Sequence, residues 1–385
     1  MTIMNNLFGN KKKLIQENKV LKQEIENLHK EIDSLNDKYN NLSKIRANEH
    51  TAASFCNWSY INYYFRDDFE EKFKKMVENL PKESKNYFKW LFLRSLAINY
   101  NRRETLFFDD ELEKQKQWTD FKINNVSEDK IGKYNFKGGY NLHGFIDLNL
   151  SKEDKNFLEN KDIIDAGAFT GDTAIPLSEV THKNVFAFEP FEESFKLLKE
   201  NVEINNISNI KPVNKSLGNI NGERSLYLAN DNFQGITSDS NLRKYTEELK
   251  VQEVTVDQFV KENNLDVGLI TIDVEGAEKD LLNGAIETIK SQKPMLFISM
   301  YHSVEDFFEI KPWIENLDLG YKFEIIKEQP WTFIADTILK CKIINDWLTL
   351  LKSVLIRVYV INKENINSII YIIIIVNNLF INLKD

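Results

Sequence analysis

The sequence contains few cysteines and no excess of positive charge, and both absences narrow the class of protein. Only two cysteines are present in 385 residues, Cys56 and Cys341, and they lie far apart, outside any C-x-x-C pair. They therefore indicate neither a disulfide framework nor a zinc site, which fits a reducing compartment. The formal net charge of −9 argues against nucleic-acid binding, because that function needs a basic face to neutralise phosphates.

Long apolar runs are also scarce. The N-terminal segment MTIMNNLFGNKKK turns polar and basic at once and lacks the apolar core of a signal peptide. Near the other end, residues 369–376 are eight consecutive apolar or aromatic residues, but asparagines flank them, and a membrane span needs about 20. We interpret residues 345–385 as a low-complexity tail rich in Ile and Asn. The sequence thus predicts a cytoplasmic protein without a membrane span, whose contact with a membrane would be peripheral and through this tail.

One short segment stands out by its glycines. IIDAGAFTGD (163–172) reads as an apolar strand that ends in Asp165, followed by a turn through Gly167 and Gly171 into a helix. Glycine in such a turn lets the backbone approach a ligand without a Cβ in the way. Twenty-four residues after Asp165, Glu189 follows the next strand, where a carboxylate can bind the two hydroxyls of an adenosine ribose.

The same segment lacks the glycine pattern of a dinucleotide site. Phe169 interrupts the G-x-G-x-x-G spacing, and Gly171 is followed by Asp172, Thr173 and Ala174 instead of a third glycine. A nicotinamide dehydrogenase is therefore disfavoured. A nucleoside cofactor without phosphates, S-adenosylmethionine, fits the D-x-G-x-x-x-G spacing better.

A second block lies about a hundred residues further on. LITIDVEGAEKDLLNGA (269–285) is again a buried strand that ends in an acid, Asp273, and turns through a glycine into a helix. The apolar strand after it ends near Tyr301 and His302. In open α/β sheets the ligand lies outside the carboxyl ends of the strands, so we expect these residues on the same rim as Asp165 and Glu189.

These blocks resemble the FkbM family of S-adenosylmethionine-dependent methyltransferases. The matching segments are DAGAFTGDT (165–173), FEP (188–190), TVDQFV (255–260), IDVEGAEKDLLNGA (272–285) and YHSVEDFFEI (301–310). The resemblance covers roughly residues 130–344. It implies an α/β, Rossmann-like methyltransferase fold with a mostly parallel seven-stranded sheet wrapped by helices. It also implies an enzyme that transfers a methyl group, usually onto a hydroxyl of a sugar or secondary metabolite.

The resemblance also assigns roles to residues of the cofactor side. Asp165 and the turn backbone suit the methionyl part, Glu189 suits the ribose, and Asn214 or Ser216, near the end of the third strand, suits the adenine edge. The predicted cofactor-binding residues are Asp165, Gly167, Gly171, Asp172, Glu189 and Ser216.

The acceptor side needs a group that takes the hydroxyl proton. His302 and Asp273 are the predicted catalytic residues, with His302 as a general base whose pKa we expect near 6–7. His302 as a structural cap of its strand is the alternative, and the Tyr–His pair of the family favours the catalytic role. A divalent metal held by Asp273 and Glu275 is possible but disfavoured. Glu278, one turn into the next helix, is expected to be a solvated or capping acid.

The alternation of apolar and helical segments gives the domain plan. The predicted divisions are a coiled coil at 1–48, a helical region and lead-in at 49–158, the methyltransferase domain at 159–344 and the tail at 345–385. Sheet strands are expected at 162–166, 184–188, 210–214, 268–273, 294–300, 321–327 and 332–339. Further strands at 224–229 and 250–256 would flank a polar insertion, 230–241, that reads as a loop and a lid.

Two further patterns lie before the domain. Leucines recur every seventh residue across residues 14–42, which favours a parallel coiled coil and a homodimer over a single helix packed on the chain's own core. The heptad positions are Leu14, Leu21, Leu28, Leu35 and Leu42, with Asn18, Ile25, Ile32 and Tyr39 between them. Residues 50–125 carry aromatics at helical spacing, which we interpret as helix cores and not as an acceptor-binding surface.

The leading functional hypothesis is O-methylation of a small-molecule or glycan acceptor: a sugar, surface-glycan or secondary-metabolite precursor. Fold alone does not fix function, so two alternatives stay open. One is an N-methyltransferase on the same fold. The other is a coiled-coil scaffold of a glycan-assembly complex with a degenerate methyltransferase domain.

Overall fold

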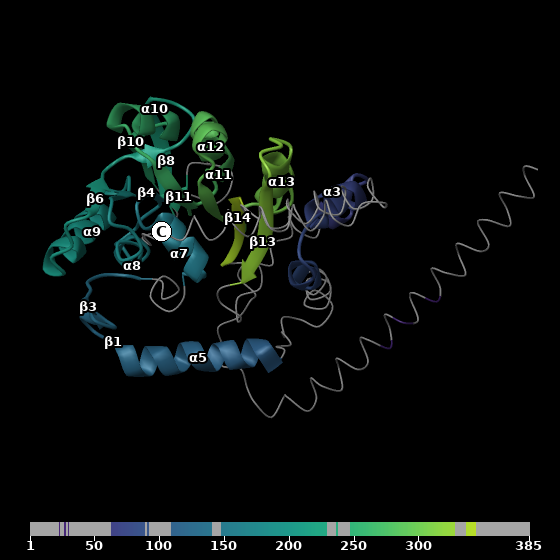
Figure 1. Ribbon diagram of the computed structural model, residues 1–385, viewed down its shortest axis with the longest axis horizontal. Coiled ribbons are helices and arrows are strands. Elements are labelled where there is room, and N and C mark those ends of the chain that lie inside the picture. The colour runs from purple at the N-terminus through teal and green to yellow at the C-terminus, as the bar shows by residue number, and fades with distance from the viewer. Residues whose placement is uncertain are drawn as a thin grey trace, which may run out of the picture. The chain divides into compact units, whose positions relative to one another are not determined.

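A central sheet of seven strands organises the chain in the computed structural model (Figure 1). The structure describes residues 63–88, 91, 109–140, 148–228, 236–237, 247–327 and 336–343, together with Gln23, Asn27 and Lys30. The strands of the central sheet are β4 (Asp162–Ala166), β5 (Val185–Phe188), β6 (Ile210–Val213), β11 (Val267–Ile272), β12 (Met295–Ser299), β13 (Tyr321–Lys327) and β14 (Thr337–Ile343). Their order is β13-β14-β12-β11-β4-β5-β6.

The five central strands β12, β11, β4, β5 and β6 pair in parallel, and β14 pairs antiparallel with β12. All five residues of β4 are buried, and β11 is buried at all but one position. Near-continuous apolar strands of this kind are typical of parallel sheets that are covered on both faces. The predicted Rossmann-like α/β fold with a mostly parallel seven-stranded sheet is confirmed.

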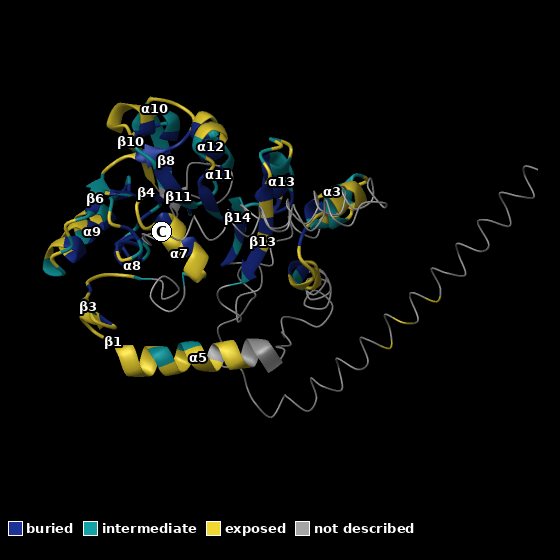
Figure 2. Cartoon of the chain, viewed as in Figure 1, coloured by how far each residue is buried: buried dark blue, intermediate teal, exposed yellow. Residues whose placement is uncertain are grey.

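Helices connect the strands and cover the sheet. They are α7 (Lys152–Leu158), α8 (Ala174–Leu177), α9 (Glu192–Ile204), α10 (Val256–Asn263), α11 (Glu278–Asn283), α12 (Ile286–Gln292) and α13 (Val304–Glu315). Leu158, Ile163, Leu177 and Leu198 belong to one buried apolar cluster that joins α7, α8 and α9 to the sheet. Figure 2 shows buried residues concentrated in the strands and exposed residues on the outer sides of the helices.

The two extra strands that the sequence predicts are present, in a separate sheet. Its strands are β7 (Ser216–Leu217), β8 (Gly222–Leu228), β9 (Ile236–Thr237) and β10 (Glu247–Val254), in the order β7-β10-β8-β9. Arg224 of β8 forms ion pairs with Glu253 and with Asp280 of α11. Except for residues 236–237, the predicted lid lies outside the described residues, so that role stays a prediction.

The part that precedes the sheet includes α3 (Phe69–Val77), α5 (Asp109–Asn125) and three short strands, β1 (Val126–Ser127), β2 (Lys130–Ile131) and β3 (Tyr134–Asn135). The buried ammonium group of Lys311 on α13 donates to the backbone carbonyls of Lys75 and Glu78 at the end of α3. The ring of Tyr63 stacks on Phe308 with centroids 4.9 Å apart. Tyr63 and Phe88 are thus buried in a core, whereas Phe65, which the aromatic pattern also placed in a helix core, is 78% exposed.

The last strand of the sheet differs from the prediction. Its described part runs over residues 337–343, beyond the predicted end at 339, and residues 332–335 of the predicted strand lie outside the described residues. Lys340 and Lys342, which lie past the predicted end, both pair with Asp154 of α7, at 2.8 and 3.0 Å. Because their charges are paired, the strand continues past residue 339.

Several sequence predictions concern segments beyond the described residues. The heptad segment, apart from Gln23, Asn27 and Lys30, and the tail after Ile343 lie outside them. The chain divides into two compact units, Met1–Lys342 and Ile343–Asp385. In the part of the chain that the structure describes, no helix is both long and apolar enough to cross a membrane.

Candidate active site

Four of the predicted site residues come to one edge of the sheet. Asp165 lies near the carboxyl end of β4, Glu189 follows β5, Asp273 follows β11 and His302 follows β12 by three residues. These four strands are neighbours in the order β12-β11-β4-β5. The backbone N–H of Asp273 also donates to the carbonyl of Ala166, 2.9 Å away, which ties the two central turns together.

The glycine turn after β4 is built for tight packing against its neighbours. Gly167 and Gly171 both have positive φ angles, +84° and +97°. A Cβ on Gly167 would lie 1.8 Å from the carbonyl oxygen of Asp273, and one on Gly171 would lie 2.9 Å from Leu198 on α9. Glycine is therefore required by the contacts of the turn with protein atoms, and not only by the approach of a ligand that the sequence indicates.

Glu189 joins the turn after β4 to the turn after β5. Its side chain is almost fully buried, and its two carboxyl oxygens accept hydrogen bonds from the backbone N–H groups of Phe169 (2.9 Å) and Phe191 (2.8 Å). Burial raises the pKa of Glu189 to about 8, although these two donors oppose the shift and the acids Asp165 and Asp172 add to it. The carboxyl group is thus held rigidly, in a place where a bound ligand that donates hydrogen bonds would favour its ionised form.

Asp165 is a second buried acid beside it. One carboxyl oxygen accepts a hydrogen bond from the hydroxyl of Thr271, 2.6 Å away, and the other has no hydrogen-bond partner among the described residues. Burial raises the pKa of Asp165 to about 7, and the nearby acid Asp172, itself buried, adds to the shift. A buried acceptor without a partner is costly, so the site is suited to a ligand that supplies a donor.

The two candidates for the adenine edge have different surroundings. The side-chain amide of Asn214 donates to the backbone carbonyls of Glu189 (3.0 Å) and Pro190 (3.3 Å), so it braces the loop that holds Glu189. The hydroxyl of Ser216 lies 3.4 Å from the backbone carbonyl of Gln252 and 3.4 Å from a carboxyl oxygen of Glu253, both on β10. The role of Ser216 in binding a cofactor stays a prediction.

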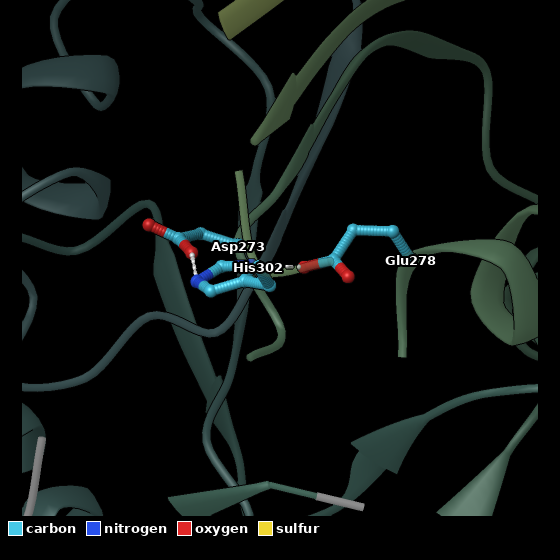
Figure 3. Close-up of side chains that lie close together, drawn as sticks. All are labelled: Asp273, Glu278 and His302. Carbon is cyan, nitrogen blue, oxygen red and sulfur yellow. Dashed lines mark hydrogen bonds and ion pairs between the residues drawn. The ribbon is translucent and has the colours of Figure 1, made fainter. Parts of the chain in front are cut away.

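On the acceptor side, His302 lies between carboxylates (Figure 3). Its Nδ1 is 2.8 Å from Oε1 of Glu278, and its Nε2 is 3.4 Å from Oδ1 of Asp273 and 3.6 Å from Oε2 of Glu275. The imidazole is 1% exposed and the Glu278 side chain 0%, whereas the side chains of Asp273 and Glu275 are 43% and 31% exposed. The cluster is closed on the Glu278 side and open on the other.

Glu278 is the residue of this cluster whose surroundings differ most from the sequence interpretation. The expectation of a solvated acid is wrong, since the side chain is fully buried. Nor does it cap the helix, since Oε1 accepts from the backbone N–H of Val274 in the preceding turn, at 3.2 Å, and α11 has no side-chain cap among the described residues. The signal was present in the segment DVEGAE, where a tight turn lets a carboxylate five residues after Asp273 fold back towards the strand ends.

The surroundings of His302 also correct its predicted titration. Burial by itself would lower the pKa of His302, but the carboxylates of Glu278, Glu275 and Asp273 together raise it to about 10. The expectation of a base with a pKa near 6–7 is therefore wrong for the ligand-free chain. The pKa is higher than expected because several carboxylates surround one imidazole, and the spacing of the strands in the sequence does not reveal their number.

Comparison with known proteins agrees with this architecture. Residues 165–323 match the family model of the methyltransferase FkbM domain, which confirms the resemblance found in the sequence. A curated relative, "Methyltransferase 1" of Beauveria bassiana, is 26% identical over 180 residues, which cover 42% of this chain and 72% of that protein. These matches support a methyltransferase activity.

Solved structures are similar at lower identity. A methyltransferase FkbM from Methylobacillus flagellatus is 17% identical with a TM-score of 0.37, over 67% of this chain and 59% of that one. The chain thus spans about three fifths of the length of that protein. An rRNA methylase from Streptococcus thermophilus is 15% identical with a TM-score of 0.33, over 50% of this chain and 92% of that one.

Proposed function

We propose that this protein is an S-adenosylmethionine-dependent O-methyltransferase whose acceptor is a hydroxyl of a sugar, a surface glycan or a secondary-metabolite precursor. The observation that carries the proposal is the pair of buried acids, Asp165 near the end of β4 and Glu189 after β5, which flank the glycine turn of a matched methyltransferase domain. The carboxyl oxygens of both acids are hydrogen-bond acceptors, to which a nucleoside cofactor could donate from its hydroxyl and ammonium groups.

The cofactor would lie along the turn after β4. Glu189 would accept hydrogen bonds from both ribose hydroxyls, and Asp165 would face the ammonium group of the methionyl part with its unpaired carboxyl oxygen. Gly167, Gly171 and Asp172 complete the turn that holds these two acids in place. Because Glu189 is fixed by two backbone N–H donors, it needs little reorganisation on binding.

Methyl transfer would then occur at the open edge beside Asp273 and His302. The acceptor oxygen attacks the methyl carbon as the carbon–sulfur bond breaks, the bond electrons return to sulfur, and the hydroxyl proton leaves towards the acidic cluster. Sulfonium is a good leaving group, so holding the three atoms in line provides most of the rate enhancement. The half-exposed carboxylate of Asp273 and the buried imidazole of His302 are the groups that meet the acceptor.

The first experiment tests cofactor binding. Titration of the purified protein with S-adenosylmethionine in a calorimeter should show one site per chain. In Glu189→Ala the affinity should fall about ten- to hundredfold, because a charge-assisted double hydrogen bond is lost. Absence of binding by the wild type would favour the alternative of a degenerate scaffold.

The second experiment identifies the acceptor and tests the catalytic pair. Mass spectrometry should compare surface glycans and small metabolites from a strain with and without the protein, where the loss of one methyl increment marks the acceptor. Return of the wild-type gene should restore the increment, whereas His302→Ala should not, since we expect turnover to fall about 10²–10⁴-fold while S-adenosylmethionine binding is retained. Full restoration by that variant would leave His302 as a structural cap.

A further inference from the structure

The Nε2 atom of His302 is a polar atom of the acceptor side that makes no hydrogen bond in the described part of the chain. It is buried, and it has no hydrogen-bond partner among the described residues. The other ring nitrogen, Nδ1, is already bonded to Glu278. Buried imidazole nitrogens without a partner are rare in folded proteins, so this atom indicates a ligand that binds there.

Each of the two carboxylates that face Nε2 lies from it at about the distance between two ligands of one ion. Asp273 and Glu275 place carboxylate oxygens 3.4 and 3.6 Å from it. Both distances are longer than a normal N–H···O hydrogen bond of about 2.7–3.2 Å. Two ligand atoms that each bind an ion at about 2.1 Å with a tetrahedral angle lie about 3.4 Å apart, which agrees with what is observed.

The far side of the imidazole has the partner that metal-binding histidines use. A ligating histidine donates its second ring N–H to a carboxylate, which fixes the tautomer and the ring orientation. Glu278 is 2.8 Å from Nδ1, and its Oε1 is itself held by the backbone N–H of Val274. With the proton on Nδ1, the lone pair of Nε2 points to the side of Asp273.

We propose that a divalent cation binds to Nε2 of His302 and to carboxylate oxygens of Asp273 and Glu275, with Glu278 as the positioning residue behind the imidazole. Asp273, His302 and Glu278 each offer one donor atom within 4.8 Å of the others, and Glu275 adds a carboxylate oxygen 3.6 Å from Nε2. One nitrogen and two oxygen ligands suit manganese or zinc, since magnesium prefers oxygen ligands only. The half-exposed side chains of Asp273 and Glu275 leave a path for the ion from solvent.

The ion would complete the acceptor side of the proposed methyltransferase, and in this respect the inference rests on that function. Three protein ligands leave a coordination position open for the acceptor hydroxyl. Coordination would lower the pKa of the hydroxyl, and the proton would pass to solvent past the exposed carboxylates of Asp273 and Glu275. The hydroxyl oxygen would bond to the methyl carbon as the carbon–sulfur bond breaks, which leaves a neutral thioether.

The test is a cation titration without cofactor or acceptor. Full-length protein, freed of metal by a chelator, is titrated with manganese chloride and separately with zinc chloride in a calorimeter. We expect one ion per chain for at least one of the two metals. Asp273→Asn, a conservative change of a half-exposed side chain, should weaken binding of that metal at least tenfold, and His302→Ala at least as much.

Glu278→Gln tests the positioning role. It should weaken cation binding about 10–100-fold, which is typical when an outer partner of a metal-bound histidine is removed. Glu287→Gln, an exposed acid on the neighbouring helix α12, is the matched control and should bind the ion like the wild type. Circular dichroism of each variant checks that the fold is intact. For a variant that does not fold, the Asp273→Asn titration decides.

The outcomes separate this inference from the proposed function. Cation binding that survives in Glu189→Ala, together with lost S-adenosylmethionine binding, supports both. Two results would overturn the metal site and leave the methyltransferase intact. In the first, the wild type binds S-adenosylmethionine but no cation. In the second, Asp273→Asn binds the cation as tightly as the wild type does. Cation binding without any S-adenosylmethionine binding supports the metal site and overturns the proposed function.

Discussion

The pH dependence of cofactor binding is the sharpest consequence of the buried Glu189. Its pKa is raised to about 8 by burial, against 4.5 for an exposed glutamate. Ribose hydroxyls bind the ionised carboxylate more strongly than the neutral acid. If the cofactor binds only the ionised form, the affinity should rise about 100-fold between pH 6 and pH 9, with a slope of about tenfold per pH unit that flattens above pH 8.

Glu189→Gln is the perturbation that isolates this group. Glutamine is neutral at every pH, and its amide nitrogen cannot accept the hydrogen bond that one of the two backbone donors, Phe169 or Phe191, now makes. At pH 8.5 the variant should bind S-adenosylmethionine about ten- to hundredfold more weakly than the wild type. At pH 6 the two proteins should differ far less, because most Glu189 is then protonated.

Calorimetric titrations of both proteins from pH 6 to pH 9 measure the effect. The ratio of the two affinities removes the contribution of the cofactor's own ionisable groups, which are common to both. Asp165, with a pKa of about 7, adds a slope at the acid end in both proteins, and its charge also contributes to the raised pKa of Glu189. Parallel curves over the whole range would refute the reasoning, since Glu189 would then either not titrate there or not face the cofactor.

The same shift fixes the sign of a stability effect. The folded-state pKa of Glu189 lies above its unfolded value, so its neutral form is favoured by folding. This contribution to stability is complete below about pH 4.5 and is lost as the pH rises through about 8. The melting temperature of the ligand-free wild type should therefore fall over this range more steeply than that of Glu189→Gln.

Three further predictions concern the scaffold. Deletion of residues 1–48 should convert a dimer to a monomer in light scattering while cofactor binding is kept; a truncated protein that stays dimeric would show that the heptad segment is not the interface. Gly167→Ala should destabilise the fold by roughly 2 kcal/mol or more in urea unfolding, because its Cβ would lie 1.8 Å from a backbone oxygen at a φ of +84°, and an unchanged midpoint would contradict this packing. Although burial opposes it, ion pairs with Lys340 and Lys342 lower the pKa of Asp154 to about 2, so its contribution is present above the unfolded pKa near 4 and lost as the pH falls towards 2. Asp154→Asn should reduce this acid sensitivity, and an identical acid unfolding curve would argue against the pair.

The sheet was predictable because a parallel strand buried on both faces has a distinctive sequence. The segments around Ile163, Ile270 and Leu296 are short, nearly continuous apolar runs, and each is followed by a turn and a polar residue. Such runs also predict which residues share one edge of the sheet, because parallel strands align their carboxyl ends. The end of the antiparallel β14 was placed too early, at residue 339, and the strand continues through Lys340 and Lys342, whose partner Asp154 lies almost two hundred residues away along the chain.

The character of the acceptor side could not be predicted for a related reason. Strand spacing brings Asp273 and His302 to one edge, but it says nothing about the number of carboxylates around the imidazole. That number depends on how the turn after Asp273 folds back, which places Glu278 against Nδ1 and Glu275 near Nε2. A lone histidine at a strand end would be an ordinary base with a pKa near 6.5. A histidine held from behind by one buried carboxylate, with two half-exposed carboxylates in front, is instead a ligand arrangement, and the choice between the two chemistries is made by a single turn of the chain.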